Sequence, residues 1–243
     1  MDRLRVPLAE RMRPKTLDEF FGQEHIVGKN KLLRRAIQTG SVGSMIFYGP
    51  PGTGKTTLAG IIAKMLDANI EKLNAVSNGV AEAKAVIERA RTSKAMFNKD
   101  TYLLLDECHR WNKAQSDCVL QAIEEGSIYF IGSTTENPYT SMTRAIVSRC
   151  SVFEFKKLSE KDVLKVIERA LTDRENGLGE IKIEMPDEAK RYLAFACNGD
   201  VRTALNALEL AVKSTKMSKD KYIHITKETM AECLNKRPLS LDE

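Results

Sequence analysis

Short, largely apolar runs recur along the first two thirds of this chain of 243 residues. They lie at residues 45–48, 102–105, 127–132 and 152–155, and a further strand is expected at 70–73, where Ile70 and Leu73 flank two charged residues. Apolar runs of this length, without a regular polar face, are typical of strands that are buried on both sides. Because segments of helical character separate them, the pattern predicts an α/β core with a mostly parallel sheet of five strands flanked by helices.

The segments between these runs have apolar residues at helical spacing. In the core they predict helices near residues 30–38, 57–66, 80–91 and 113–124. After residue 156 the pattern is helical throughout, with segments at 159–173, 187–197, 200–214 and 226–234. The predicted N-caps are Asn30, Asp187 and Asp200. We therefore predict two domains: the α/β core over residues 1–155, whose residues 1–24 form an extended segment, and a small all-α lid over residues 156–243.

A glycine-rich loop follows the first predicted strand. Residues 49–56 read Gly-Pro-Pro-Gly-Thr-Gly-Lys-Thr, which fits the phosphate-loop pattern G-x-x-x-x-G-K-[ST]. Glycines let backbone N–H groups turn toward phosphate oxygens, Lys55 supplies positive charge to the β/γ-phosphates, and the Thr56 hydroxyl is a ligand for Mg²⁺. The strand before the loop and the helix after it place the phosphates at a helix N-terminus. The predicted nucleotide-binding residues are Gly49, Pro50, Pro51, Gly52, Thr53, Gly54, Lys55, Thr56 and Thr57.

Two adjacent carboxylates follow the apolar strand at 102–105. Asp106 is a predicted ligand of Mg²⁺, and Glu107 is the predicted general base that polarises the attacking water. Parallel strands bring their carboxyl ends to one edge of the sheet. We therefore expect both carboxylates to lie beside the phosphate loop.

Polar residues also follow the strand predicted at 127–132. If that strand lies between the other two, a polar side chain at its end points toward the γ-phosphate. Asn137, or alternatively Thr135, is then the residue that orients the water or senses the phosphate. Pro138 ends the strand, because it has no backbone N–H for the ladder.

Composition and charge narrow the class of protein. No run of eighteen apolar residues is present, so no membrane span is expected. The five cysteines are odd in number and form no C-x-x-C pair, which indicates reduced thiols in a cytoplasmic protein. Residues 1–40 hold nine Lys/Arg against five Asp/Glu and so account for most of the net charge of +5. This excess is either a nucleic-acid-facing arm or a solvated surface.

These motifs together resemble the AAA+ ATPases of the clamp-loader-like clade, and more narrowly the replication-associated recombination protein A family (RarA, also called MgsA). The pieces specific to that family are Thr-Thr-Glu-Asn-Pro at 134–138 and Asn-Lys-Ala-Gln at 112–115. The matching segments that AAA+ proteins share more widely lie at 7–14, 22–25, 49–57, 106–111, 148–150 and 199–202.

The resemblance implies roles for residues outside the phosphate loop. Ile26 and Val27 would line the adenine pocket, and Asn137 would be sensor 1. Arg149 would be an arginine finger that acts in trans on the nucleotide of a neighbouring subunit. Arg202 would be sensor 2, contacting the γ-phosphate in cis.

The resemblance also implies partners. It predicts a P-loop ATP hydrolase with ATP/ADP and Mg²⁺ as cofactors, acting on single-stranded or fork-like DNA at stalled or damaged replication forks. It predicts a homo-oligomer formed through Arg149 and a C-terminal region that such proteins have beyond this length, so the chain is expected to be an ATPase-plus-lid fragment. Further expected partners are single-stranded-DNA-binding protein and other replisome proteins, in the cytoplasm and, in a bacterium, at the nucleoid. The amides of residues 77–79 and the cations of the next helix are candidates for facing DNA: Lys84, Arg89, Arg91 and Lys94.

Other classes fit less well. A clamp-loader or RuvB-like DNA motor subunit shares most of these motifs and stays open as the alternative. Asp-Glu-Cys-His at 106–109 also matches the D-E-x-H box of superfamily-two helicases, but the chain is too short for their two RecA-like domains. A small-molecule kinase shares the loop, yet a poised Glu107 favours water as acceptor. A subunit that binds without hydrolysing would have an altered Lys55 or Glu107, and both are intact.

Overall fold

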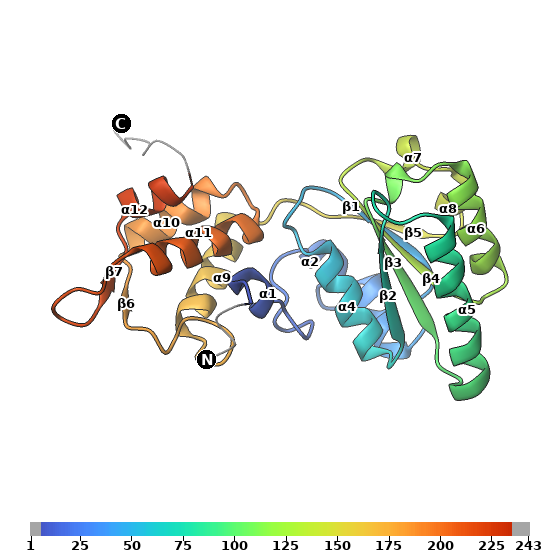
Figure 1. Cartoon of the computed structure of the whole chain (residues 1–243), viewed down its shortest axis with the longest axis horizontal. Helices are drawn as coiled ribbons and strands as arrows, with labels where there is room; N and C mark the ends of the chain where they lie inside the picture. Colours follow the sequence, from blue (N-terminus) through green and yellow to red (C-terminus); the bar gives the residue numbers. More distant parts are fainter. Residues whose placement is uncertain (1–5, 235–243) are drawn as a thin grey trace. The chain divides into compact units, whose positions relative to one another are not determined.

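The computed structural model describes residues 6–234 and divides into two compact units (Figure 1). One unit is Pro14–Lys156; the other joins the N-terminal residues up to Arg13 with those from Lys157 onward. Residues 1–5 and 235–243, at the outer ends of the predicted core and lid, lie outside the described residues. Among the helices of residues 6–234, none combines the length and apolar character that crossing a membrane requires.

The N-terminal segment differs from its prediction as an extended part of the core, residues 1–24. Residues 8–11 instead form helix α1 (Leu8–Arg11), which packs in the helical unit. Leu8 is fully buried there, and its N–H donates to Glu209 Oε2 at 3.0 Å. Pro7 directly precedes this helix, where its fixed φ suits the first turn. The described residues up to Arg13 therefore belong with the helical unit.

The core contains one sheet of five parallel strands in the order β2-β3-β4-β1-β5. Their bounds are β1 Met45–Tyr48, β2 Asn69–Asn74, β3 Thr101–Asp106, β4 Tyr129–Thr134 and β5 Ser151–Glu154. β4 lies between β1 and β3, as the predicted site requires. In register, Thr134 is opposite Tyr48, and Ser133 is opposite Asp106. The ends of these three strands therefore meet at one edge.

Helices cover both faces of the sheet (Figure 1). Alternate residues of β3 enter two separate cores, because successive side chains of a strand point to opposite faces. Tyr102 and Leu104 pack with the helices of one face, and Leu103 and Leu105 with those of the other. The first face is covered by α2 (Glu24–Val27), α3 (Leu32–Thr39) and α4 (Lys55–Met65). The second is covered by α5 (Val80–Phe97), α6 (Lys113–Glu124) and α8 (Arg144–Val147).

The second unit is helical, as the sequence predicts, with one addition. Its helices from Lys157 onward are α9 (Glu160–Thr172), α10 (Asp187–Ala196), α11 (Val201–Ser214) and α12 (Lys227–Cys233). Two very short strands, β6 (Ile183–Glu184) and β7 (Ile223–His224), also pair in parallel. Of the predicted caps, Asp200 accepts from Thr203 N–H as expected, whereas Lys31 and Pro186 take the places assigned to Asn30 and Asp187.

Candidate nucleotide-binding site

The phosphate loop connects β1 to α4 and adopts conformations that only glycine reaches easily. Its three glycines all have positive φ: 140° at Gly49, 67° at Gly52 and 99° at Gly54. The loop also leaves no room for side chains at two of them. A Cβ at Gly49 would lie 2.2 Å from the Phe155 carbonyl oxygen, and one at Gly54 would lie 2.7 Å from the Phe20 ring. The sequence motif is therefore also a packing requirement of this fold.

We expect Gly49→Ala to lower the free energy of unfolding by about 1–3 kcal/mol or more, because the residue would be both strained and in contact with backbone. Gly60→Ala is the matched control. Gly60 lies inside α4 with open space around its Cα, so alanine should be neutral or stabilise by up to about 1 kcal/mol. Urea denaturation of both variants measures the difference; equal stabilities would contradict the packing argument.

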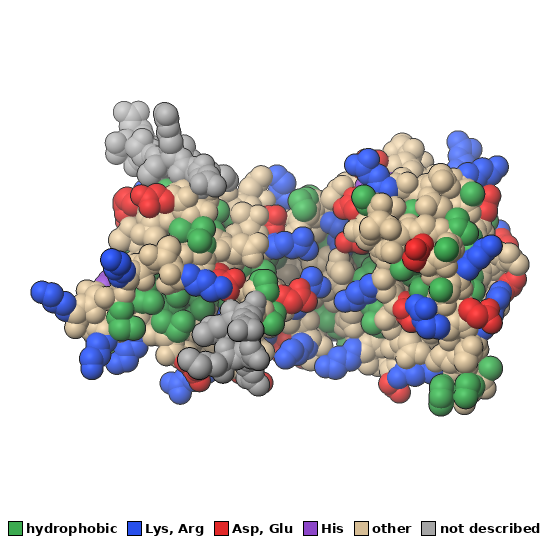
Figure 2. Space-filling model, in the orientation of Figure 1, with side chains coloured by type: hydrophobic (Ala, Val, Ile, Leu, Met, Phe, Trp, Pro, Cys, Tyr) green, Lys and Arg blue, Asp and Glu red, His purple; other side chains and the backbone are tan. Residues whose placement is uncertain are grey.

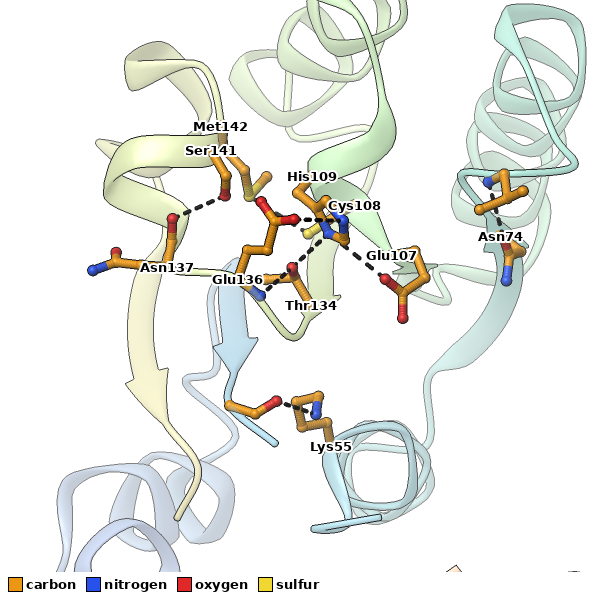
Figure 3. A network of polar contacts seen from close by, with 12 residues as sticks. Lys55, Asn74, Glu107, Cys108, His109, Thr134, Glu136, Asn137, Ser141 and Met142 are labelled. Carbon is orange, nitrogen blue, oxygen red and sulfur yellow. Dashed lines mark hydrogen bonds and ion pairs between the residues drawn. The ribbon is translucent and has the colours of Figure 1, made fainter. Parts of the chain in front are cut away.

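Lys55 begins α4 and is almost buried, with 8% of its surface exposed. Its Nζ donates to the carbonyl oxygens of Gly49 at 2.8 Å and of Pro50 at 2.7 Å (Figure 3). The ammonium group thus lies within the curve of its own loop. A buried cation at a helix N-terminus attracts an anion such as a phosphate.

The predicted acidic pair lies at the carboxyl end of β3. Asp106 is the last strand residue, opposite Asn74 of β2 and Ser133 of β4. Glu107 follows with φ 55°, a left-handed conformation that is uncommon for residues other than glycine. Strained backbone of this kind concentrates at functional sites. Figure 3 shows Glu107 and Lys55 at the same edge of the sheet.

The residues present fit a magnesium ion. Thr56, in the first turn of α4, offers a hydroxyl oxygen, and Asp106 offers a carboxylate; both side chains are half-buried. Mg²⁺ prefers oxygen ligands and usually keeps several waters, completing its shell with phosphate oxygens. A site with one hydroxyl and one carboxylate suits that habit.

His109 also lies at this edge of the sheet, although its place in the sequence predicts no role for it. It lies in the 3₁₀ turn Cys108–Arg110, and its side chain is 5% exposed. Its Nδ1 is 2.7 Å from Thr134 Oγ1 and 3.7 Å from Glu107 Oε2, and its Nε2 is 3.4 Å from Glu136 Oε1 (Figure 3). The only sequence signal was a polar ring directly after an apolar strand.

Cys108 differs from its polar neighbours Glu107 and His109 because it is part of the apolar core. It is buried against Gly132 and Met142, as a small apolar residue would be. Burial raises the pKa of its thiol far above the ordinary value. Cys108 therefore packs as a core residue.

The two candidates for sensor 1 follow β4 and are both exposed. Asn137 is the N-cap of α7 (Pro138–Ser141), and its Oδ1 accepts from Tyr139 N–H at 3.0 Å. Figure 3 shows its side chain pointing away from His109 and Glu107. The strand itself ends one residue before Thr135. Either assignment stays a prediction, and a role for Asn137 would require its side chain to leave the cap.

The two predicted arginines lie in different units. Arg149 follows α8 and is exposed; its guanidinium pairs with Glu124 and donates from Nη1 to the Ala145 carbonyl at 2.9 Å. Arg202 is exposed in the first turn of α11, after the Asp200 cap. Arg149 as a finger and Arg202 as sensor 2 both stay predictions.

The predicted adenine-pocket residues lie in α2, beside an anchoring glutamine. Ile26 and Val27 are each 4% exposed and belong to the apolar core that includes α4. Gln23, directly before them, donates from Nε2 to the carbonyls of Thr53 at 3.4 Å and Lys156 at 2.7 Å. This glutamine, which sequence reasoning missed, ties α2 both to the phosphate loop and to the last core residue.

The helix expected to face DNA has most of its charge already paired. Arg89 pairs with Glu71, Arg91 with Glu125 and Lys94 with Asp100. At its start, Gly79 N–H donates to Glu82 of the same helix. On the face shown in Figure 2, basic and acidic side chains are interspersed. The geometry therefore adds no support for DNA contact at α5.

The chain matches known families over most of its length. The family model of the Holliday junction DNA helicase RuvB P-loop domain matches residues 12–145, which is more than half of the chain. The chain belongs to this family. A second model, the AAA C-terminal domain, matches residues 179–243 of this RuvB-type P-loop protein. Both units of the structure thus have counterparts, and the predicted P-loop AAA+ fold is confirmed.

Individual relatives refine the comparison. Replication-associated recombination protein A from Bacillus subtilis is 44% identical over 237 residues, covering 98% of this chain and 55% of the relative. The protein of the same name from Escherichia coli K12 is 42% identical over 236 residues, covering 97% and 53%. The RuvB Holliday junction branch migration motor of Thermotoga maritima superposes with a TM-score of 0.72 at 28% identity, covering 93% of this chain and 72% of that one. The chain spans about half the length of the curated relatives it matches.

Proposed function

We propose that this chain binds ATP with Mg²⁺ and hydrolyses it to do work on DNA at stalled or damaged replication forks. The observation that carries the proposal is the meeting of a strained glycine loop, the buried Lys55 and the carboxylates of Asp106 and Glu107 at one edge of the sheet. Membership of a P-loop AAA+ family gives ATP hydrolysis as the activity class.

Each residue then has a distinct task. Loop amides and Lys55 hold the β- and γ-phosphates, while Thr56 and Asp106 hold the metal ion, which neutralises charge on the phosphate oxygens. Glu107 takes a proton from the attacking water. Arg149 from a neighbouring copy and Arg202 from the same chain stabilise charge that builds up on the transferred phosphoryl group. Turnover therefore requires assembly into a homo-oligomer.

DNA as the substrate is supported by the relatives. Several are named replication-associated recombination protein A, and a 42% identical relative in Dictyostelium discoideum is named ATPase WRNIP1. We infer action in the cytoplasm, with single-stranded-DNA-binding protein or other replisome proteins as partners. A branch-migration motor is the second candidate, because the matching family model and the superposed structures are those of RuvB.

The direct test is ATP turnover measured without DNA and with single-stranded, forked and four-way-junction DNA. We expect basal turnover to rise with single-stranded or forked DNA. Stimulation by the four-way junction alone would favour the branch-migration role instead. Absence of ATP binding in calorimetry would contradict the nucleotide site itself.

If DNA binding is by phosphate contact, its affinity should fall steeply with salt. For six phosphate contacts on a single strand, the slope of log K against log salt would be about −4. Fluorescence anisotropy with two single strands of unrelated sequence measures both quantities. A flat salt response, or a strong preference for one sequence, would contradict this mode of binding.

A further inference from the structure

His109 occupies a position between the predicted general base and the loop that follows β4. Its ring lies within 3.7 Å of the Glu107 carboxylate and 2.7 Å from the Thr134 hydroxyl. On the other side, its Nε2 lies 3.4 Å from the Glu136 carboxylate. The His109 side chain is 5% exposed, whereas the two carboxylates beside it are partly exposed.

The two ring nitrogens of His109 face the end of β4 and the loop that follows it. Thr134, the last residue of β4, accepts at Oγ1 from the backbone N–H of Glu136 at 3.0 Å and is hydrogen-bonded to His109 Nδ1 at 2.7 Å. His109 Nε2 faces the carboxylate of Glu136. The ring therefore contacts the end of β4 through one nitrogen and the following loop through the other.

The turn that carries His109 is held firmly. Cys108, the preceding residue, is buried beneath β4 and contacts Met142, so the turn cannot move without disturbing the core. Glu107, the residue before Cys108, has φ 55°, a left-handed conformation that residues other than glycine rarely adopt. The ring is thus a rigid spacer between Glu107 and the segment 134–136.

We propose that His109 is a positioning residue that couples the direction of the Glu107 carboxylate to the loop after β4. The inference rests on the proposed function, in which Glu107 is the general base. In this arrangement the imidazole fixes the Glu107 carboxylate relative to Thr134 and Glu136. Misplacing a catalytic group by about 1 Å costs up to about 10²-fold in rate, so this contact controls turnover without touching ATP.

Three substitutions separate this role from a structural one. The amide of Asn ends at the level of Nδ1, so His109→Asn keeps a polar atom facing Thr134 and Glu107. The amide of Gln reaches the level of Nε2, so His109→Gln keeps only the contact with Glu136. We expect His109→Ala to lower kcat by about 10–100-fold, His109→Gln to resemble it, and His109→Asn to recover most of the loss. ATP affinity and Tm should stay close to the parent in the Asn and Gln variants.

The overturning results are equally definite. Parental kcat in His109→Ala, or no recovery in His109→Asn relative to His109→Gln, would refute the coupling. If the alanine variant does not fold, the comparison of Asn with Gln decides alone. The double variant Thr134→Val/His109→Ala should lose no more kcat than the slower of the two single variants, because both substitutions disrupt the same hydrogen-bond network. A parent without turnover would contradict the proposed function, whereas an active parent with unaffected His109 variants would contradict this inference alone.

Discussion

Replacing Glu107 by glutamine is expected to lower ATP turnover by about 10²–10⁴-fold and to leave ATP binding intact. The amide keeps the size of the side chain but cannot accept a proton from water. Glu107 lies beyond the end of β3 at the same edge as Lys55, and the proposed phosphate contacts are those of the loop. Steady-state phosphate release gives kcat, and calorimetry gives the dissociation constant of ATP.

Glu154→Gln is the matched control for this prediction. Glu154 is the last residue of β5, the parallel strand next to β1, and its side chain is exposed. The substitution removes the same charge from a strand end that β4 and β1 separate from β3, so turnover should stay near the parental value. Equal losses in both variants would show that general charge, and not a base at residue 107, supports the reaction.

Much of the core could be predicted because β1, β3 and most of β4 are short apolar runs with clear ends. β1 and α6 have the predicted bounds, and β3 differs by one residue at each end. β4 was predicted two residues too early, since it continues through Ser133 and Thr134, each only 1% exposed. A hydrophobic pattern cannot identify polar residues that are buried by their hydrogen bonds.

Other elements could not be predicted from the sequence, because they are too short or depend on contacts with distant residues. The four-residue helices α1, α2, α7 and α8 span about one helical turn, and the strands β6 and β7 have two residues each. Elements this short show no repeat in their hydrophobic pattern. Leu8 joins the helical unit through Glu209, 201 residues away along the chain. Contacts of this range have no local signal.

The residues of the candidate site could be proposed from sequence motifs, whereas the contacts between them could not. Lys55, Asp106 and Glu107 could be assigned because each follows a strand in a pattern with a chemical reason. His109 and Gln23 act through partners that are 25 to 133 residues away. Their roles became visible only when the sheet order brought Thr134 and Lys156 beside them.

The second large effect is expected at Arg149. Its guanidinium pairs with Glu124 of its own chain, and both side chains are partly exposed. Exposed ion pairs contribute about 0–1 kcal/mol, so releasing the arginine costs little. An arginine finger contributes 10³-fold or more to phosphoryl transfer, which corresponds to about 4 kcal/mol. The ion pair with Glu124 is therefore no obstacle to a role in a neighbouring subunit.

Arg149→Ala should lower kcat by about 10³-fold or more in the assembled protein. Arg144→Ala, which replaces an exposed arginine at the start of α8, the short helix before Arg149, should stay near the parent. Mixing decides whether the finger acts in trans. An equimolar mixture of Arg149→Ala and Glu107→Gln protomers contains interfaces that join an intact base to an intact finger, about a quarter of all interfaces if assembly is random. Turnover of the mixture should exceed that of either variant alone by far. A mixture as slow as its components, under conditions where the protomers exchange, would place the action of Arg149 within its own subunit or remove it from the reaction.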